Sequence, residues 1–173
     1  MNIKARINLL FLVIILLTLY GCSYTFTGAS VPEHLESIAI PTFDDRSGSA
    51  EPRLEQIFTD LLTQKFIDDN TLQVREKQNA NAVLECTITS LVDAPLAITG
   101  SNTGEGISKR KITITVKVVY RDFVLRKIVW DRNFTDYGEY DNAGDLQTVR
   151  AEAIEYAANK IAEDIMLAVV SNW

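Results

Sequence analysis

One stretch decides the fold class of this chain: Lys109-Arg110-Lys111-Ile112-Thr113-Ile114-Thr115-Val116-Lys117-Val118-Val119-Tyr120. Apolar side chains occupy its even positions from Ile112 to Tyr120, and lysine and threonine occupy most of the odd ones. Successive side chains of a strand point to opposite faces of a sheet, so this period of two predicts a strand with one buried face. The stretch 84–89 alternates in the same way. Both segments are therefore expected in a sheet that packs one face on a core.

A third long strand is predicted after this stretch. It covers about residues 127–137 and pairs back through a turn at 121–125. Trp130 and Phe134 are its expected core anchors, because they are its largest apolar side chains.

Shorter segments complete the sheet. Residues 38–40 form a short strand that a proline ends. Whether residues 72–92 make one strand or two stays open. Residues 42–50 form a polar loop, and the glycine-rich segment 99–106 is expected to be a mobile loop because it offers little to pack.

Two segments show the period of a helix that buries one stripe. The first covers residues 54–66, with Ser49 as its expected cap, Pro52 in its first turn and Asn70 at its end. The second opens at residues 141–145 and closes the chain. Its apolar stripe contains Leu146, Val149, Ala153, Ile154, Ala157, Ile161, Ile165 and Val169.

The elements thus run β-α-β-β-β-β-α. One apolar sheet face and two helices with one apolar stripe each close most simply as an α/β (α+β) two-layer sandwich. We expect one mostly antiparallel or mixed sheet of four to five strands, with both helices packed on the same face.

The N-terminus predicts export and lipid attachment. Lys4 and Arg6 precede an apolar run at 9–17, a pattern typical of a secretory signal and too short to span a bilayer. The run ends in Leu19-Tyr20-Gly21-Cys22, which resembles a bacterial lipobox. We therefore predict three parts: a lipoprotein signal peptide at 1–21, a lipidated tether at 22–33 that begins with Cys22, and a single α/β domain at 34–173.

Side chains suited to catalysis or metal binding are scarce. Once Cys22 carries lipid, Cys86 is the only other cysteine, so an intramolecular disulfide is excluded, and its strand position favours burial. His34 is the only histidine, so no histidine and cysteine metal cluster is possible. We expect no enzyme activity, no metal and no cofactor.

Basic residues are concentrated in one short region. Without residues 1–21 the chain has 15 bases and 23 acids, a formal charge of −8. Seven of these bases lie between residues 109 and 127, where the only acid is Asp122. Lys111, Lys117 and Arg121 share the parity of the exposed strand face. The full set of seven bases is Lys109, Arg110, Lys111, Lys117, Arg121, Arg126 and Lys127.

This concentration predicts a site for an anionic ligand such as the phosphates of lipopolysaccharide (LPS). The alternative is protection of a sheet edge by lysines. Nucleic acid is not expected, because the lipobox directs the chain to the envelope and its overall charge is acidic.

The mature chain resembles the LptE family of LPS-assembly lipoproteins over nearly its whole length. The resemblance includes the region 130–140 and the closing helix, and its clearest motifs are Cys22-Ser23-Tyr24-Thr25-Phe26-Thr27-Gly28, Val31-Pro32-Glu33-His34-Leu35, Ile38-Ala39-Ile40-Pro41-Thr42-Phe43 and Glu51-Pro52. Asp44-Asp45 stands where asparagine is frequent in the family.

The resemblance implies a sheet-plus-two-helix domain that sits inside the LptD β-barrel of Gram-negative outer membranes, helps that barrel assemble and binds LPS during its transport. It also implies an outer-membrane location. No acid follows Cys22 directly, so we expect a lipid anchor on the periplasm-facing side.

A second family shares the same opening. An Ile-Ala-Ile-Pro-x-Phe strand followed by Arg46-Ser47-Gly48 also resembles lipoproteins of curli-secretion pores and activators of peptidoglycan synthases. Such a chain would be an oligomeric pore or a regulatory binding module.

Overall fold

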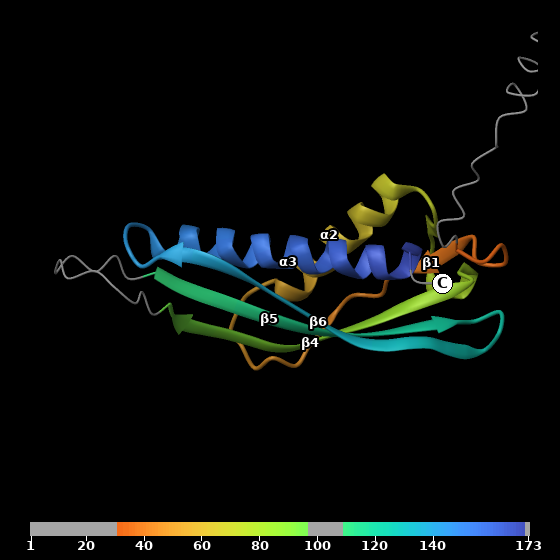
Figure 1. The fold of residues 1–173 in the computed structure, drawn as a ribbon, viewed down its shortest axis with the longest axis horizontal. Helices are drawn as coiled ribbons and strands as arrows, with labels where there is room; N and C mark the ends of the chain where they lie inside the picture. The colour runs from red at the N-terminus through yellow and green to blue at the C-terminus, as the bar shows by residue number, and fades with distance from the viewer. Residues whose placement is uncertain (1–30, 97–108, 172–173) are drawn as a thin grey trace, which may run out of the picture.

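The computed structural model describes residues 31–96 and 109–171, which form one sheet covered by two helices (Figure 1). The predicted signal peptide, Cys22 and the glycine-rich loop lie outside the described residues. In chain order the elements are β1 (Ser37–Ala39), β2 (Asp44–Asp45), α2 (Leu54–Asp69), β3 (Gln73–Val74), the 3₁₀ turn η1 (Lys77–Asn79), β4 (Ala82–Pro95), β5 (Lys109–Asp122), β6 (Lys127–Asp141) and α3 (Leu146–Ser171).

The sheet is mixed and has six strands, in the order β3-β1-β4-β5-β6 with β2 also paired to β4. The α+β class and the two-helix layer are confirmed, but the sheet is larger than the predicted four to five strands. The extra strand, Asp44–Asp45, comes from the segment expected to be a polar loop. It pairs in parallel with β4 at Thr87 and Ile88, beyond the short region where β1 pairs with the same strand. Residues 72–92 form parts of two strands, β3 and β4.

Strands β4, β5 and β6 make a long antiparallel meander. Their pairing puts Cys86 beside Val118 and Val116 beside Phe134. The predicted inner face is buried, since Ile112, Ile114, Val116, Val118 and Tyr120 are all fully enclosed. A register shift between Ile88 and Ser90 moves the inward positions of β4 from even to odd residue numbers, so Leu91 and Asp93 face the helices.

Helix α2 starts five residues after the predicted cap. The hydroxyl of Ser49 accepts a hydrogen bond from Ser47 within the loop, so it does not cap the helix. Arg53, which has a left-handed backbone at φ 62°, precedes the first helical residue, Leu54. The predicted end at Asn70 is confirmed, and this residue takes the left-handed conformation common after a helix.

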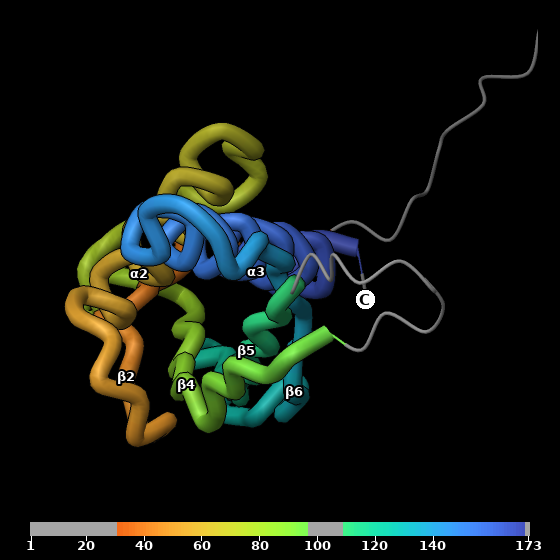
Figure 2. Tube along the Cα trace, turned by 90° about the vertical axis from the view of Figure 1, so that its left-hand side faces the viewer, coloured from red at the N-terminus to blue at the C-terminus, as the bar shows by residue number. Residues whose placement is uncertain are grey.

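Helix α3 opens as predicted and packs along β5 and β6. Asp145 accepts hydrogen bonds from the backbone of Gln147 and the hydroxyl of Thr148, which satisfies donors at the helix start. Both helices lie on the same face of the sheet (Figure 2). Neither described helix is long and apolar enough to cross a bilayer.

The space between the layers is filled by apolar side chains of both helices and the inner sheet face. Phe58 of α2 stacks on Phe43 at 5.3 Å between ring centroids, and Trp130 of β6 packs beside Tyr120 at 5.4 Å. Cys86 lies in the same core, where burial raises the pKa of its thiol. The core therefore holds this cysteine as an apolar side chain.

Candidate functional site

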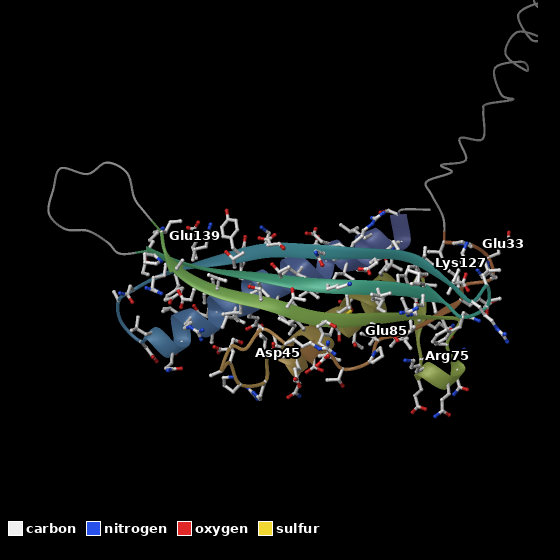
Figure 3. The ribbon with its side chains drawn as sticks, turned by 90° about the horizontal axis from the view of Figure 1, so that it is seen from below. Glu33, Asp45, Arg75, Glu85, Lys127 and Glu139 are labelled. Carbon is white, nitrogen blue, oxygen red and sulfur yellow. The ribbon has the colours of Figure 1, made fainter. Side chains whose placement is uncertain are left out.

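The seven predicted site residues are spread along the hairpin of β5 and β6. Strand β5 has 14 residues and is therefore about 45 Å long. Figure 3 shows Lys127 at one end of the strands and Glu139, the neighbour of Lys111 in the register, near the other. Lys109 and Lys111 are thus far from Arg126 and Lys127, and one small ligand cannot contact both groups.

Three bases share the outer face of β5, away from the helices. Lys117 lies 3.1 Å from a carboxylate oxygen of Asp131, and Arg121 donates to Glu85 at 2.7 Å. These pairs neutralise much of the positive charge expected on this face. The ammonium group of the third base, Lys111, lies 5.1 Å from the centre of the Tyr137 ring.

Arg110 lies on the opposite side of the sheet from these three bases. Its even position puts it beneath the helices, where its Nε donates to Asp93 at 2.9 Å. Tyr140 also donates to Asp93, at 2.7 Å, and Arg150 of α3 lies 3.3 Å from the same carboxylate. Arg150 also pairs with Glu51 in the loop before α2.

This network has the geometry of a structural link. Burial raises the pKa of Asp93, but hydrogen bonds from Tyr140 and Arg110 outweigh that effect, so the net pKa is lowered. The carboxylate holds together three strands and the start of α3. The described polar contacts of Arg110 are thus with other residues of the fold, and its role in ligand binding stays a prediction.

The turn between β5 and β6 is anchored by a buried acid. The Asp122 side chain is only 1% exposed, accepts the backbone N–H of Leu125 at 2.8 Å and lies 2.7 Å from Nε2 of His34. Burial raises the pKa of Asp122, while the hydrogen bonds from Leu125 and His34 lower it, and the net pKa is below its ordinary value. The only histidine thus joins the start of the domain to the turn.

Bases and apolar side chains meet on the surface of this turn. A hollow of about 270 Å³, called here the basic hollow, is lined by Arg121, Asp122, Phe123, Arg126, Lys127 and Ile128. Within the described residues, neither Arg126 nor Lys127 forms an ion pair with an acid. Ile128 is 51% exposed and Phe123 is 37% exposed. The site therefore places two bases that have no described ion pair, Arg126 and Lys127, beside open apolar surface.

The exposed apolar residues of the turn are the part that sequence reasoning missed. The signal was present, because Phe123-Val124-Leu125-Arg126 contains no glycine, asparagine or proline, the residues that usually form turns. Arg126 takes a left-handed backbone at φ 52° without the help of a glycine. Across 31–96 and 109–171, the structure has no group of histidine, cysteine and acidic side chains that could hold a metal ion.

Comparison with solved structures shows which proteins share this fold. The fold matches a minor lipoprotein from Acinetobacter baumannii, at 13% identity and a TM-score of 0.53, over 80% of this chain and 94% of that one. It matches a hypothetical protein from Chlamydia trachomatis at 8% identity and a TM-score of 0.57, over 78% and 95% of the two chains. A protein from Xanthomonas campestris matches at 13% identity and a TM-score of 0.54, over 83% and 91%. At these identities the likeness establishes a shared fold, which a bacterial lipoprotein also adopts.

The family follows from the sequence of the domain itself. Residues 35–169 match the model of the LptE lipopolysaccharide-assembly family, and the chain belongs to that family. A comparison with curated proteins finds no match. Membership makes the chain a lipoprotein of outer-membrane biogenesis with a role in LPS assembly, within a family that is not enzymatic. It favours the first of the two resemblances seen in the sequence.

Proposed function

We propose that this chain is anchored by lipid on Cys22 to the periplasmic side of the outer membrane, works with an LptD-like β-barrel and binds LPS. It catalyses no reaction and uses no cofactor. The observation that carries the proposal is the family match over residues 35–169, since members of this family partner LptD and bind LPS. The signal sequence and lipobox support the anchor.

Co-purification tests the partner. The tagged chain, extracted from envelopes in mild detergent, is expected to retain one large β-barrel protein. Recovery of a peptidoglycan synthase or a homo-oligomeric ring instead would contradict the proposal and favour the regulator or pore type of lipoprotein.

Substitution of Cys22 tests the anchor. Cys22→Ala is expected to leave the domain folded, because the described core begins at Leu35, but to release it from membranes when no barrel partner is present. Lipid attachment contributes about 0.8 kcal/mol per buried methylene. A Cys22→Ala chain that stays in the outer membrane without its partner would show that the anchor lies elsewhere.

For LPS we propose contact at the basic hollow. LPS combines phosphates with acyl chains, and the hollow combines Arg126 and Lys127 with the apolar side chains of Phe123 and Ile128. Guanidinium and ammonium groups suit phosphate, and the apolar wall suits hydrocarbon. Arg121 completes the hollow but shares its charge with Glu85.

A matched pair of double variants tests this site. Arg126→Glu with Lys127→Glu is expected to lower LPS affinity about tenfold or more, because one charge-assisted contact is worth about 1.5–3 kcal/mol. The residual binding should also depend less on salt. Lys109→Glu with Lys111→Glu changes the same charge at the far end of the same hairpin and should do much less. Equal losses in both variants would contradict a site at the turn.

Variants on the outer face of β5 test an alternative LPS site in the same binding experiment. Lys111, Lys117 and Arg121 point the same way, so an extended anionic ligand along the face would need all three. Arg121 also lines the hollow, so the variant that separates the two sites reverses Lys111 and Lys117 alone. If this double reversal to glutamate lowers affinity more than the turn pair does, the face rather than the hollow binds LPS.

A further inference from the structure

We propose that Val124 and Leu125, called here the turn tip, insert into the surface of the lipid bilayer that holds the N-terminal lipid. The domain would then be attached at two points, by its lipid and by the turn tip. This proposal rests on the lipid anchor of the proposed function, but it involves residues that do not line the basic hollow. It adds contact with phospholipid to the proposed contact with LPS.

The composition of the turn is the first observation. Val124 is 51% exposed and Leu125 is 52% exposed, at a place where water-facing turns normally carry polar residues. Neither residue is required by the turn geometry, because the turn is held by the backbone N–H of Leu125 on Asp122. Where a protein departs from the usual polar composition of a turn, the departure is expected at a functional or strained site. The exposed pair therefore points to an apolar occupant.

The position of the turn is the second observation. The domain begins at the same end as the turn: Figure 3 shows Glu33 beside Lys127, and Figure 1 shows the described chain entering at that end. The contact between His34 and Asp122 fixes this arrangement. In the same region the backbone N–H of Phe123 donates to the carbonyl oxygen of Asn81 at 2.8 Å.

The length of the tether makes contact with the bilayer possible at this end. Only eight residues separate Cys22 from Val31, so the lipid and the start of the domain are at most about 30 Å apart. The strands are about 45 Å long. An anchored domain can therefore reach the membrane surface with its turn, whereas the end that carries Val92 lies about one strand length further from the anchor.

The charge beside the tip suits a bilayer surface. Arg126 and Lys127 follow Leu125 directly in the chain, and bases next to apolar side chains are the pattern by which peripheral segments bind anionic leaflets. Val124 and Leu125 would enter the boundary between headgroups and acyl chains, while the two bases would remain among the phosphates. The occupant is thus a phospholipid leaflet with anionic headgroups.

The experiment measures the depth of the tip in vesicles without LPS or a barrel. The processed, lipidated chain is reconstituted in vesicles of phosphatidylethanolamine and phosphatidylglycerol, with an environment-sensitive fluorophore on Val124→Cys. Val92→Cys is the matched control, because this valine is 53% exposed and lies near the other end of the sheet. Cys86 is buried and does not compete for the label.

The label at 124 is expected to shift its emission to shorter wavelength and to be quenched several-fold by brominated phospholipid. The label at 92 should remain water-like, and Leu125→Asp should reduce the quenching at 124 while the chain still floats with the vesicles. Equal, weak quenching at both positions in floating chains would overturn the turn tip but leave the anchor intact. Quenching that appears only after LPS is added would assign the tip to LPS and overturn the bilayer contact. A chain that does not float would overturn the anchor and the two-point attachment together.

Discussion

The backbone of Ala153 in α3 packs directly against Gly138 of β6. A Cβ atom on this glycine would overlap the Ala153 carbonyl group and lie only 2.9 Å from its Cα atom. The close approach lets α3 lie flat along the edge strand. Glycine is required here because a neighbouring backbone occupies the space that a Cβ atom would take. Gly138 does not have a positive φ, so its backbone conformation is not the reason for the glycine.

Gly138→Ala is therefore expected to destabilise the domain by about 2–3 kcal/mol, the upper part of the range for an overpacked core. Urea unfolding measures the change in the free energy of unfolding. Ala153→Gly should not rescue the variant, because the obstructing atoms belong to the backbone. Gly144→Ala is the contrast: nothing lies within 4 Å of its Cβ, and its φ of 76° alone should cost about 1 kcal/mol. Rescue by Ala153→Gly would show that side chains cause the overlap.

The core aromatics give a second prediction. Phe58 is fully buried against Phe43, and Trp130 is 9% exposed between Tyr120 and Phe134. Phe58→Ala and Trp130→Ala should each cost about 3–5 kcal/mol, the range for truncating a large buried aromatic. Lys111→Ala, on the outer face, should cost less than about 0.5 kcal/mol. Equal destabilisation by Lys111→Ala and Trp130→Ala in urea would contradict the assignment of the sheet faces.

The third prediction concerns the acid dependence of stability at the turn. The pKa of Asp122 is lowered in the folded state, because its hydrogen bonds from Leu125 and His34 outweigh the effect of burial. A group with a lowered pKa stabilises the fold above its unfolded pKa, about 3.9 for aspartate, and this contribution is lost as pH falls through the folded value. Asp122→Asn should therefore cost about 1–3 kcal/mol at pH 7 and less at pH 3.

Urea unfolding of the parent protein and of Asp122→Asn, each at pH 7 and pH 3, measures how the cost of the substitution changes with pH. Asp44→Asn is a suitable control, because Asp44 is exposed and its ion pair with Arg46 lies on the surface, where such pairs contribute little. An Asp122→Asn penalty that is the same at pH 7 and pH 3 would show that its charge is not what stabilises the turn.

The sequence predicts the long elements because their patterns are local. The positions of the apolar residues predict which face of each element is buried, as in the alternation from Ile112 to Tyr120 and the helical stripe of α3. In the structure these faces form the core. The short strands are different. Asp44–Asp45 becomes β2 only because β4 extends beyond β1 and leaves pairing groups free, and a two-residue polar segment carries no sign of that distant partner.

Strand β6 shows the same limit in another form. Its predicted end at residue 137 precedes a glycine, which normally interrupts a strand. The strand continues to Asp141 because α3 packs over Gly138, a contact between segments that sequence periodicity does not reveal. At the site the information was available: Arg110 has the parity of Ile112, and a turn of Phe-Val-Leu-Arg is unusual. The sequence prediction grouped the seven bases because of their charge, whereas in the structure they lie on different faces and at opposite ends of the hairpin.

That separation gives the last prediction, which distinguishes Arg110 from its neighbour Lys109. Arg110 lies beneath the helices and donates to Asp93, which also accepts from Tyr140 and contacts Arg150. Arg110→Ala leaves this partly buried carboxylate without one of its cations, so it should lower the free energy of unfolding by about 1–3 kcal/mol. Lys109→Ala removes an equal charge from an exposed position and should cost less than about 0.5 kcal/mol. Urea unfolding and LPS binding are measured on both variants, and affinity is compared under conditions where each is fully folded. Under those conditions neither should weaken LPS binding much, because both lie at the far end of the hairpin from the basic hollow. A stable Arg110→Ala domain with impaired LPS binding would reverse this assignment and return Arg110 to the ligand site.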